Sequence, residues 1–420
     1  MPELRNARTR FRIASAALLS FALFFPFYIE QIAPLRLVVV AIGFAAVALE
    51  VLFLPISRRA RIIAVVLIGA YLCLAVLAVE LVAMSLGDRL FAVNAEHLFV
   101  MFPLFAALGG LLLRLGQARA YLMVLLGVAA AVSVLAVIES FVDFSLLGRA
   151  YEYATSQREG TNRALVGSEN VLVLGAILAT MVPLTLVLPK LRYQIAVCAL
   201  LVAGVWATGS RFPALIATAI ALVQFFPQLR SLLTRFTWVL HSLAALALAG
   251  LAYLSLFVWH PFIAGSTGLD YSANYRGAIY SLVPQFLLDR PLGYLLAAPT
   301  GGYWVVDSEL HGGVDVSLSV DSEIVYAIFG LGWLGLALYA VAVFTSIAAI
   351  KRSVPLGLSS LALTALGFSL ALHGWDAMSP FWYTLLGACI SVTVWPWVVR
   401  KRDQASAATS SKTRPTKEDL

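Results

Sequence analysis

Residues 119–142 read RAYLMVLLGVAAAVSVLAVIESFV, an almost uninterrupted apolar run with an arginine at its start and a glutamate near its end. A transmembrane α-helix needs about 20 predominantly apolar residues to cross the hydrocarbon core of a bilayer. Runs of this kind recur along the chain, in which 61% of the 420 residues are hydrophobic and only 12% are charged. A soluble domain has roughly 25% charged residues. The sequence therefore predicts an all-α polytopic membrane protein.

The chain holds about twelve such runs, and the predicted architecture is a single transmembrane helical domain over residues 1–400. The first run begins after basic residues but lacks a small-x-small cleavage site, so it is interpreted as an uncleaved first helix. The polar tail 401–420 is predicted to be a disordered cytoplasmic segment. The predicted spans are 11–29, 34–55, 61–86, 97–113, 119–142, 168–189, 192–208, 212–228, 235–259, 321–350, 355–373 and 380–399.

The distribution of positive charge predicts the orientation of the spans. Cytoplasmic loops of membrane proteins carry an excess of Lys and Arg. With the N-terminus inside, all but eight of the 29 basic residues fall on the inner side, so both termini are expected to be cytoplasmic. The net charge of +7 then reflects membrane topology and not nucleic-acid binding. The eight outer cations are all arginine, whose planar donors suit bidentate phosphate binding: Arg36, Arg89, Arg149, Arg158, Arg163, Arg211, Arg276 and Arg290.

A long polar interruption, residues 260–320, separates the ninth and tenth spans and is predicted to be a large outer loop. Within it, apolar residues recur at helical spacing from Tyr275 to Leu287, which predicts a short amphipathic helix that Pro291 and Gly293 end. Arg276 is expected in its first turn, where the positive end of the helix also favours an anion.

The polar residues at outer helix ends are the candidate site, because the chain has no phosphate-cradling P-loop, HExxH motif or nucleophile elbow. Each also has a simpler structural interpretation. Arg211 and Arg36 can anchor helix ends at the lipid headgroups, and Arg158 and Arg163 can be solvated loop charges.

The candidate bases are Asp321, Glu323 and His311. The two acids precede or begin the tenth span, where carboxylates commonly cap helices, but they are also well placed to accept a proton. His311 lies next to two glycines and is either a mobile loop residue or a base. The cysteines show no metal-ligand spacing, so neither a metal nor another cofactor is expected.

Four short segments occur in an order that matches a known family. They are RALVGSEN at 163–170, TGSR at 208–211, DRPLG at 289–293 following Arg276, and DSE at 321–323 followed by GLGWLG at 330–335. Together they resemble the O-antigen ligase and O-antigen polymerase family of bacterial envelope glycosyltransferases, over roughly residues 160–350.

This resemblance implies a GT-C-like, metal-independent glycosyltransferase in the bacterial inner membrane, with a periplasmic active site. The donor would be a glycan on undecaprenyl pyrophosphate and the acceptor another glycan or lipid A-core. The bilayer and other polysaccharide-assembly membrane proteins would be its partners. The resemblance implies that Arg163, Arg211 and Arg276, followed by Arg36 and Arg158, bind the pyrophosphate, and Arg290 lies in the same matching segments.

The segment that closes the long loop departs from the ligase pattern. Ligases usually have a histidine there, whereas this chain has Asp321 and its nearest histidine is His311. An aspartate at that point is more similar to the polymerases, so a polymerase of O-antigen or exopolysaccharide repeat units is favoured. The alternatives are an O-antigen ligase and, from a different class, a lipid-linked glycan flippase or transporter, which would need charged residues deep within the spans.

Overall fold

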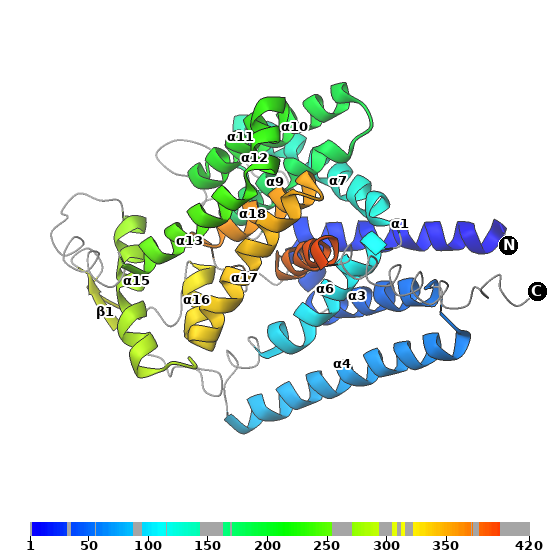
Figure 1. Ribbon diagram of the computed structural model, residues 1–420, viewed down its shortest axis with the longest axis horizontal. Coiled ribbons are helices and arrows are strands. Elements are labelled where there is room, and N and C mark those ends of the chain that lie inside the picture. Colours follow the sequence, from blue (N-terminus) through cyan, green and yellow to red (C-terminus); the bar gives the residue numbers. More distant parts are fainter. Residues whose placement is uncertain are drawn as a thin grey trace, which may run out of the picture.

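The computed structural model is built from helices, with one small β-hairpin (Figure 1). The predicted all-α architecture is confirmed, and the hairpin within the long loop pairs β1 (Val305–Ser308) with β2 (Gly312–Asp315) in antiparallel register. The residues that the structure describes are 2–31, 35–54, 56–86, 95–114, 116–142, 163–168, 170–253, 271–293, 305–308, 312–315, 322–370, 372 and 378–394.

Each of the predicted apolar runs contains a described helix. The first part of the chain has α1 (Pro2–Phe24), α2 (Pro26–Glu30), α3 (Leu35–Leu52), α4 (Arg58–Leu86), the π-helix η1 (His97–Met101), α6 (Phe102–Arg114) and α7 (Ala118–Phe141). The middle has α9 (Val171–Met181), the 3₁₀-helix η2 (Pro183–Val187), α10 (Leu191–Ala207), α11 (Arg211–Phe225), α12 (Pro227–Arg235) and α13 (Thr237–Tyr253). The last part has α15 (Tyr271–Asp289), α16 (Glu323–Leu331), α17 (Trp333–Ile350), α18 (Val354–Leu366) and a further helix, Met378–Val394, which we call the C-terminal helix.

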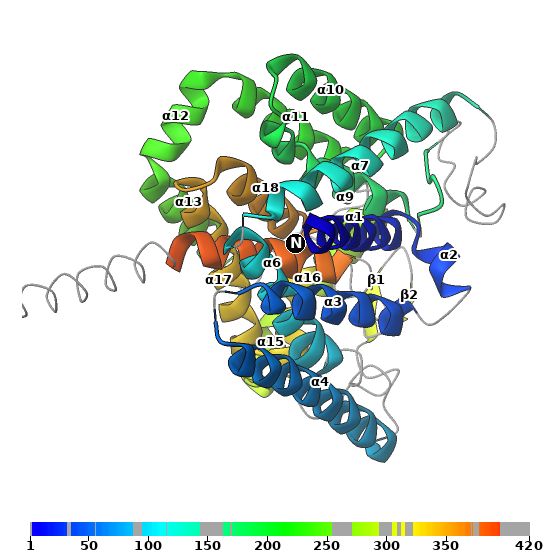
Figure 2. The ribbon, with the colours of Figure 1, turned by 90° about the vertical axis from the view of Figure 1, so that its right-hand side faces the viewer.

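Several of these helices fit a multi-pass membrane protein. Five are long and apolar enough to cross a membrane, and a sixth qualifies if α11 and α12, which meet at an angle of 96°, form one span. The bend coincides with Pro227, because a proline disfavours helical geometry in the preceding residue, and Phe226 has extended backbone angles. Helix α4 lies along one edge of the molecule (Figures 1 and 2), and only 11% of its apolar window is buried. Its exposed leucines suit contact with lipid.

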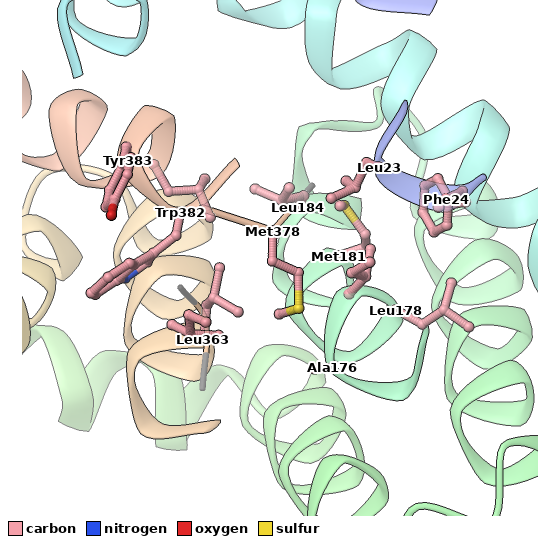
Figure 3. Packing of buried hydrophobic residues seen from close by; sticks show 14 of the residues in the cluster. Leu23, Phe24, Ala176, Leu178, Met181, Leu184, Leu363, Met378, Trp382 and Tyr383 are labelled. Atoms are coloured by element: carbon pink, nitrogen blue, oxygen red, sulfur yellow. The ribbon is translucent and has the colours of Figure 1, made fainter. Parts of the chain in front are cut away.

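The main hydrophobic core surrounds α9, in which every side chain except that of Leu172 is buried. Helices α10, α11 and α18 all pack against α9. Figure 3 shows Leu178 and Met181 of α9 with Leu184 of η2, facing Met378 of the C-terminal helix and Leu23 of α1. A helix that is apolar on all sides belongs at the centre of a bundle, and the position of α9 agrees with this rule.

The predicted tenth span, 321–350, is not one continuous helix. The chain reverses at Gly332, whose φ of +61° and ψ of −135° lie in a region that only glycine occupies readily. The first part of α17 then runs back along α16. A Cβ on Gly335 of α17 would lie 1.9 Å from the carbonyl oxygen of Ala327 on α16. The two backbones are therefore in contact, and α17 alone is long enough to cross a membrane.

The amphipathic helix predicted in the long loop is confirmed as α15, and it ends before Pro291 as expected. It begins at Tyr271, so Arg276 lies in the second turn and not in the first. Its buried side chains, including Ile279, Val283 and Phe286, form a second hydrophobic cluster with α16 and α17. The rings of Phe286 and Phe329 lie 4.7 Å apart. Helices α15 and α16 thus make a cap with its own core, at one edge of Figure 1.

A buried ion cluster joins α1 to α3. Glu50 is fully buried, and both of its carboxylate oxygens accept from Arg12, at 2.5 Å from Nε and from Nη2. Arg8 adds a third contact, 3.4 Å from Oε2. Removing one partner of a buried charge pair destabilises the fold by more than the intact pair stabilises it, because the remaining charge stays in a low-dielectric site. Arg8 and Arg12 belong to the basic residues predicted on the inner side, and no feature of the sequence indicates that they pair with Glu50.

Replacing Gly332 tests the reversal between α16 and α17. Gly332→Ala should lower the free energy of unfolding by at least about 2 kcal/mol, because its φ is positive and the new Cβ would lie 2.1 Å from the carbonyl oxygen of Pro291. Gly330→Ala is the matched control, since nothing lies within 4 Å of its Cβ position. That helical substitution should be neutral or slightly stabilising. Thermal unfolding in detergent measures both, and equal effects would contradict the assigned turn.

Glu50→Gln tests the ion cluster. It should destabilise the protein by about 3–5 kcal/mol, because Arg12 is left charged and buried. Glu80→Gln on α4 is the control, since Glu80 is exposed. The double variant Arg12→Met with Glu50→Leu should recover most of the loss. A single variant as stable as the wild type would show that the pair is not buried in the folded protein.

Candidate functional site

The structure describes only part of the predicted site. Arg158, His311 and Asp321 lie outside the described residues. For Arg276 the structure describes the backbone of α15 but not the side chain. Three candidates can be placed by their contacts, namely Arg163, Arg36 and Glu323, and Arg211 can be placed as the first residue of α11. Arg290 can be placed by its backbone.

Arg163 lies against the turn that precedes Arg211. Its Nε donates to the carbonyl oxygen of Thr208 at 3.0 Å. Gly209 has a φ of +65°, and a Cβ there would lie 2.9 Å from Arg163 Nε and 3.0 Å from its Cγ. Gly209 therefore allows both a left-handed backbone conformation and close packing of the Arg163 side chain. Two segments far apart in sequence, around residues 163 and 208, are one unit in space.

Glu139 holds the chain on which Arg163 lies. Its buried carboxylate, at the end of α7, accepts from the backbone N–H groups of Leu165 at 3.1 Å and Val166 at 2.7 Å. Val166 and Gly167 both have positive φ, 47° and 73°, so the chain turns sharply here. Hydrogen bonds to a charged acceptor are about twice as strong as neutral ones. Sequence reasoning missed this residue, although a glutamate near the end of an otherwise apolar run was the available signal.

The same unit contains the first turns of α9 and α11. Asn170 caps α9, accepting from the N–H of Leu172 at 2.8 Å. Ser210, the residue before α11, donates from Oγ to the carbonyl oxygen of Val171 at 3.1 Å. We call residues 163–168, Asn170 and 207–211 the arginine module.

The arginine module is electrostatically suited to an anion. Arg211 is the first residue of α11 and is exposed, while Arg163 is half-buried beside the preceding turn. The N-terminal end of a helix carries partial positive charge from its N–H groups, which adds to that of a guanidinium. Glu139 accepts from backbone N–H groups of the same module. The chemistry that this arrangement favours is binding of a phosphate or pyrophosphate.

Arg36 and Arg290 have other surroundings. Arg36 forms an ion pair with Glu96, 3.6 Å away, with 31% of its side chain exposed. This contact gives Arg36 a carboxylate partner within the protein, which neither the headgroup-anchoring nor the pyrophosphate-binding interpretation predicted. Arg290 directly follows α15, and the next residue, Pro291, accepts from the N–H of Trp333 at 3.0 Å. Arg290 therefore lies beside the α16–α17 reversal and not in the arginine module.

Glu323 begins α16 and is fully buried. Its N–H donates to the carbonyl oxygens of Gly367 at 2.6 Å and Leu370 at 3.0 Å, which ties the cap to the end of α18. The preceding Ser322 shares a hydrogen bond of 2.8 Å with the hydroxyl of Tyr280 on α15. The predicted capping role is therefore only partly seen, because Ser322 and not Glu323 is the residue before the helix.

Glu323 lines a cavity of about 150 Å³ between α6, α17 and the C-terminal helix. Tyr339, Trp382 and Tyr383 form part of its wall, and Figure 3 shows the last two side by side. Their rings are 5.5 Å apart. A carboxylate among aromatic rings offers one hydrogen-bonding group and flat apolar faces. A ligand ring that carries a hydroxyl group matches this lining, because the carboxylate can accept from the hydroxyl and the aromatic faces can pack against the ring.

The arginine module and the Glu323 cavity are two clusters, and the described contacts do not merge them into one. Helix α18 packs against both α9 and α17, so it connects the elements that carry the two clusters. Among the described residues, no three His, Cys, Asp or Glu side chains gather as metal ligands would.

No family model, curated protein or solved structure matches this chain. The resemblance of its short segments to the O-antigen ligase and polymerase family therefore remains a prediction.

Glu139→Ala tests whether this carboxylate positions the arginine module. Without it, the amides of Leu165 and Val166 lose a charged acceptor, and their hydrogen exchange should accelerate about tenfold or more. The control is Ser140→Ala, whose hydroxyl bonds only to the local carbonyl oxygen of Val137. Mass-spectrometric hydrogen exchange of the peptide containing residues 163–168 gives the readout. Unchanged exchange would show that other contacts hold this segment.

Proposed function

We propose that this protein is a membrane glycosyltransferase that joins lipid-linked oligosaccharide repeat units into O-antigen or exopolysaccharide. The donor is the undecaprenyl-pyrophosphate-linked glycan, and the reaction takes place at the periplasmic face of a bacterial inner membrane. In this proposal about twelve spans form a GT-C-like bundle with both termini in the cytoplasm. The observation that carries it is the packing of Arg163 onto the Thr208–Gly209 turn, immediately before Arg211.

The arginine module suits the leaving group of this reaction. The acceptor hydroxyl oxygen forms a bond to the anomeric carbon, and the bond from that carbon to the pyrophosphate oxygen breaks. Negative charge then grows on the leaving pyrophosphate, and Arg163 and Arg211 stabilise it, joined by Arg276 from α15. Donors that are already fixed before the reaction stabilise such charge without reorganising. The contacts of Arg163 with the turn, and of Glu139 with the Arg163 segment, provide this rigidity.

Either Asp321 or Glu323 is the base of the proposal. A base must take the proton that the acceptor hydroxyl loses. Glu323 is buried in a cavity with aromatic walls, which suits the acceptor sugar. In this proposal the Glu323 cavity supplies the base, and the arginine module binds the leaving pyrophosphate. In the polymerase, the acceptor is a second lipid-linked glycan. In an O-antigen ligase it would be lipid A-core, with His311 as the base.

Arginine variants in a reconstituted assay test this function. Proteoliposomes receive undecaprenyl-pyrophosphate-linked repeat units, and products are resolved by length. Arg211→Ala and Arg163→Ala should each reduce elongation by about 10²–10³-fold, the usual cost of losing one fixed donor to a developing charge. Arg230→Ala is the control, because Arg230 is an exposed cation on α12. Normal polymer from either module variant overturns the proposal. Product formed only when lipid A-core is added identifies a ligase, and glycan movement without bond formation identifies a flippase.

A pair of glycine variants separates the position of Arg163 from general backbone strain. Gly209 and Gly116 have the same φ of +65°, but nothing lies within 4 Å of the Cβ position of Gly116. Alanine at either site should cost about 1–2 kcal/mol of stability. Only Gly209→Ala displaces Arg163, so only this variant should lose elongation beyond what its stability explains. Equal activity of the two variants would remove Arg163 from the proposed site.

A further inference from the structure

The ion cluster of Arg8, Arg12 and Glu50 has an excess of positive charge. Arg12 occupies both carboxylate oxygens of Glu50, and Arg8 makes one longer contact with Oε2. Two guanidinium groups therefore share one carboxylate, which leaves a net charge of about +1 in a largely buried place. Among the described residues, Arg8 Nε is a buried donor with no hydrogen-bond partner. The guanidinium also lies 3.6 Å from the ring centroid of Phe53.

An apolar cavity of about 110 Å³ begins one helical turn along α1 from this cluster. Arg8, Arg12, Ala16 and Leu19 lie on one face of the helix, because residues three and four apart are neighbours on a helix surface. Ala16 and Leu19 line the cavity, as do Leu122 of α7 and Leu108 of α6. An apolar cavity of this order of size stays dry and accepts apolar molecules.

Tyr121 connects the cavity to the ion cluster. Its ring lines the cavity, and its hydroxyl shares a hydrogen bond of 2.7 Å with Ser15, three residues after Arg12. The hydroxyl of Ser15 also donates to the carbonyl oxygen of Arg12. Two more cations, Arg114 and Arg119, adjoin the lining residues Leu113 and Ala118 in sequence and are exposed. These arginines lie near the cavity along the chain but are not among its lining residues, and the lining itself is apolar.

We propose that this cavity binds an anionic phospholipid of the cytoplasmic leaflet. A phosphate oxygen accepts from the guanidinium of Arg8, whose side chain is 21% exposed, and part of one acyl chain occupies the cavity between Leu19 and Leu122. The excess positive charge favours an anionic headgroup over a zwitterionic one, because the ammonium of a zwitterion would face the same cations. No charged side chain lines this cavity, in contrast to the Glu323 cavity, so its lining disfavours a sugar or a free polar metabolite. The inference rests on the proposed topology, which places the N-terminus in the cytoplasm, and not on the proposed glycosyltransferase activity.

Native mass spectrometry of the full chain tests the proposal. Protein from vesicles containing equal amounts of phosphatidylglycerol and phosphatidylcholine should retain phosphatidylglycerol preferentially. Arg8→Gln keeps the Arg12–Glu50 pair and should reduce that preference about tenfold, the effect of one charged hydrogen bond. Leu122→Trp fills the cavity and should reduce retention of phosphatidylglycerol. Arg230→Gln on α12 removes an exposed cation away from the cavity lining and should change nothing.

The other outcomes overturn the site. Equal retention of the two lipids by the wild type contradicts the charge argument. An unchanged preference in Arg8→Gln, in protein whose thermal unfolding matches the wild type, removes Arg8 from the site. Displacement of phosphatidylglycerol by millimolar inorganic phosphate would mean that the basic cluster binds free anions and that the cavity holds no acyl chain.

Discussion

Glu139 is buried at the end of α7, where the N–H groups of Leu165 and Val166 donate to its carboxylate. A buried carboxylate must have its hydrogen bonds satisfied, and here the partners belong to a segment that is distant in sequence. That segment also turns through two residues with positive φ. Its path is therefore fixed both by its backbone conformation and by its hydrogen bonds to Glu139. The position of Arg163 depends on this arrangement, and the Thr208–Gly209 turn beside Arg211 packs against Arg163 in turn.

Glycine has the same structural role in two of the segments that resemble the transferase family. Gly209 makes room for the Arg163 side chain, and Gly332 lies against Pro291 so closely that a Cβ would overlap the carbonyl group. Both residues have positive φ. These short motifs thus correspond to places where two parts of the backbone meet. The physical requirement explains why glycine occurs there, whatever the function of the protein.

The sequence predicts the helices well, because the length and spacing of apolar runs are local properties. The buried face of α15 follows directly from the spacing of Ile279, Val283 and Phe286. Interactions between residues distant in sequence cannot be predicted in this way, because nothing near Glu139 or Glu50 in the sequence identifies the groups that bond to its carboxylate. The reversal at Gly332 was also missed, since residues on both sides of it are apolar and the run reads as one span. For the candidate site, the union of Arg163 with the Thr208–Arg211 turn was expected from the resemblance alone, and the Arg36–Glu96 pair was not expected.

The N–H of Glu323 bonds to the carbonyl oxygens of Gly367 and Leu370, which has a consequence for biogenesis. A ribosome makes α16 well before the end of α18, so the start of α16 has no partner for its first amide until some 45 further residues have emerged. The cap formed by α15 and α16 cannot form its contacts with the end of α18 until α17 and α18 have been synthesised. The cavity around Glu323 also needs Trp382 and Tyr383 from the C-terminal helix. This cavity is therefore completed only at the end of membrane insertion, and a chain truncated before residue 378 would lack it.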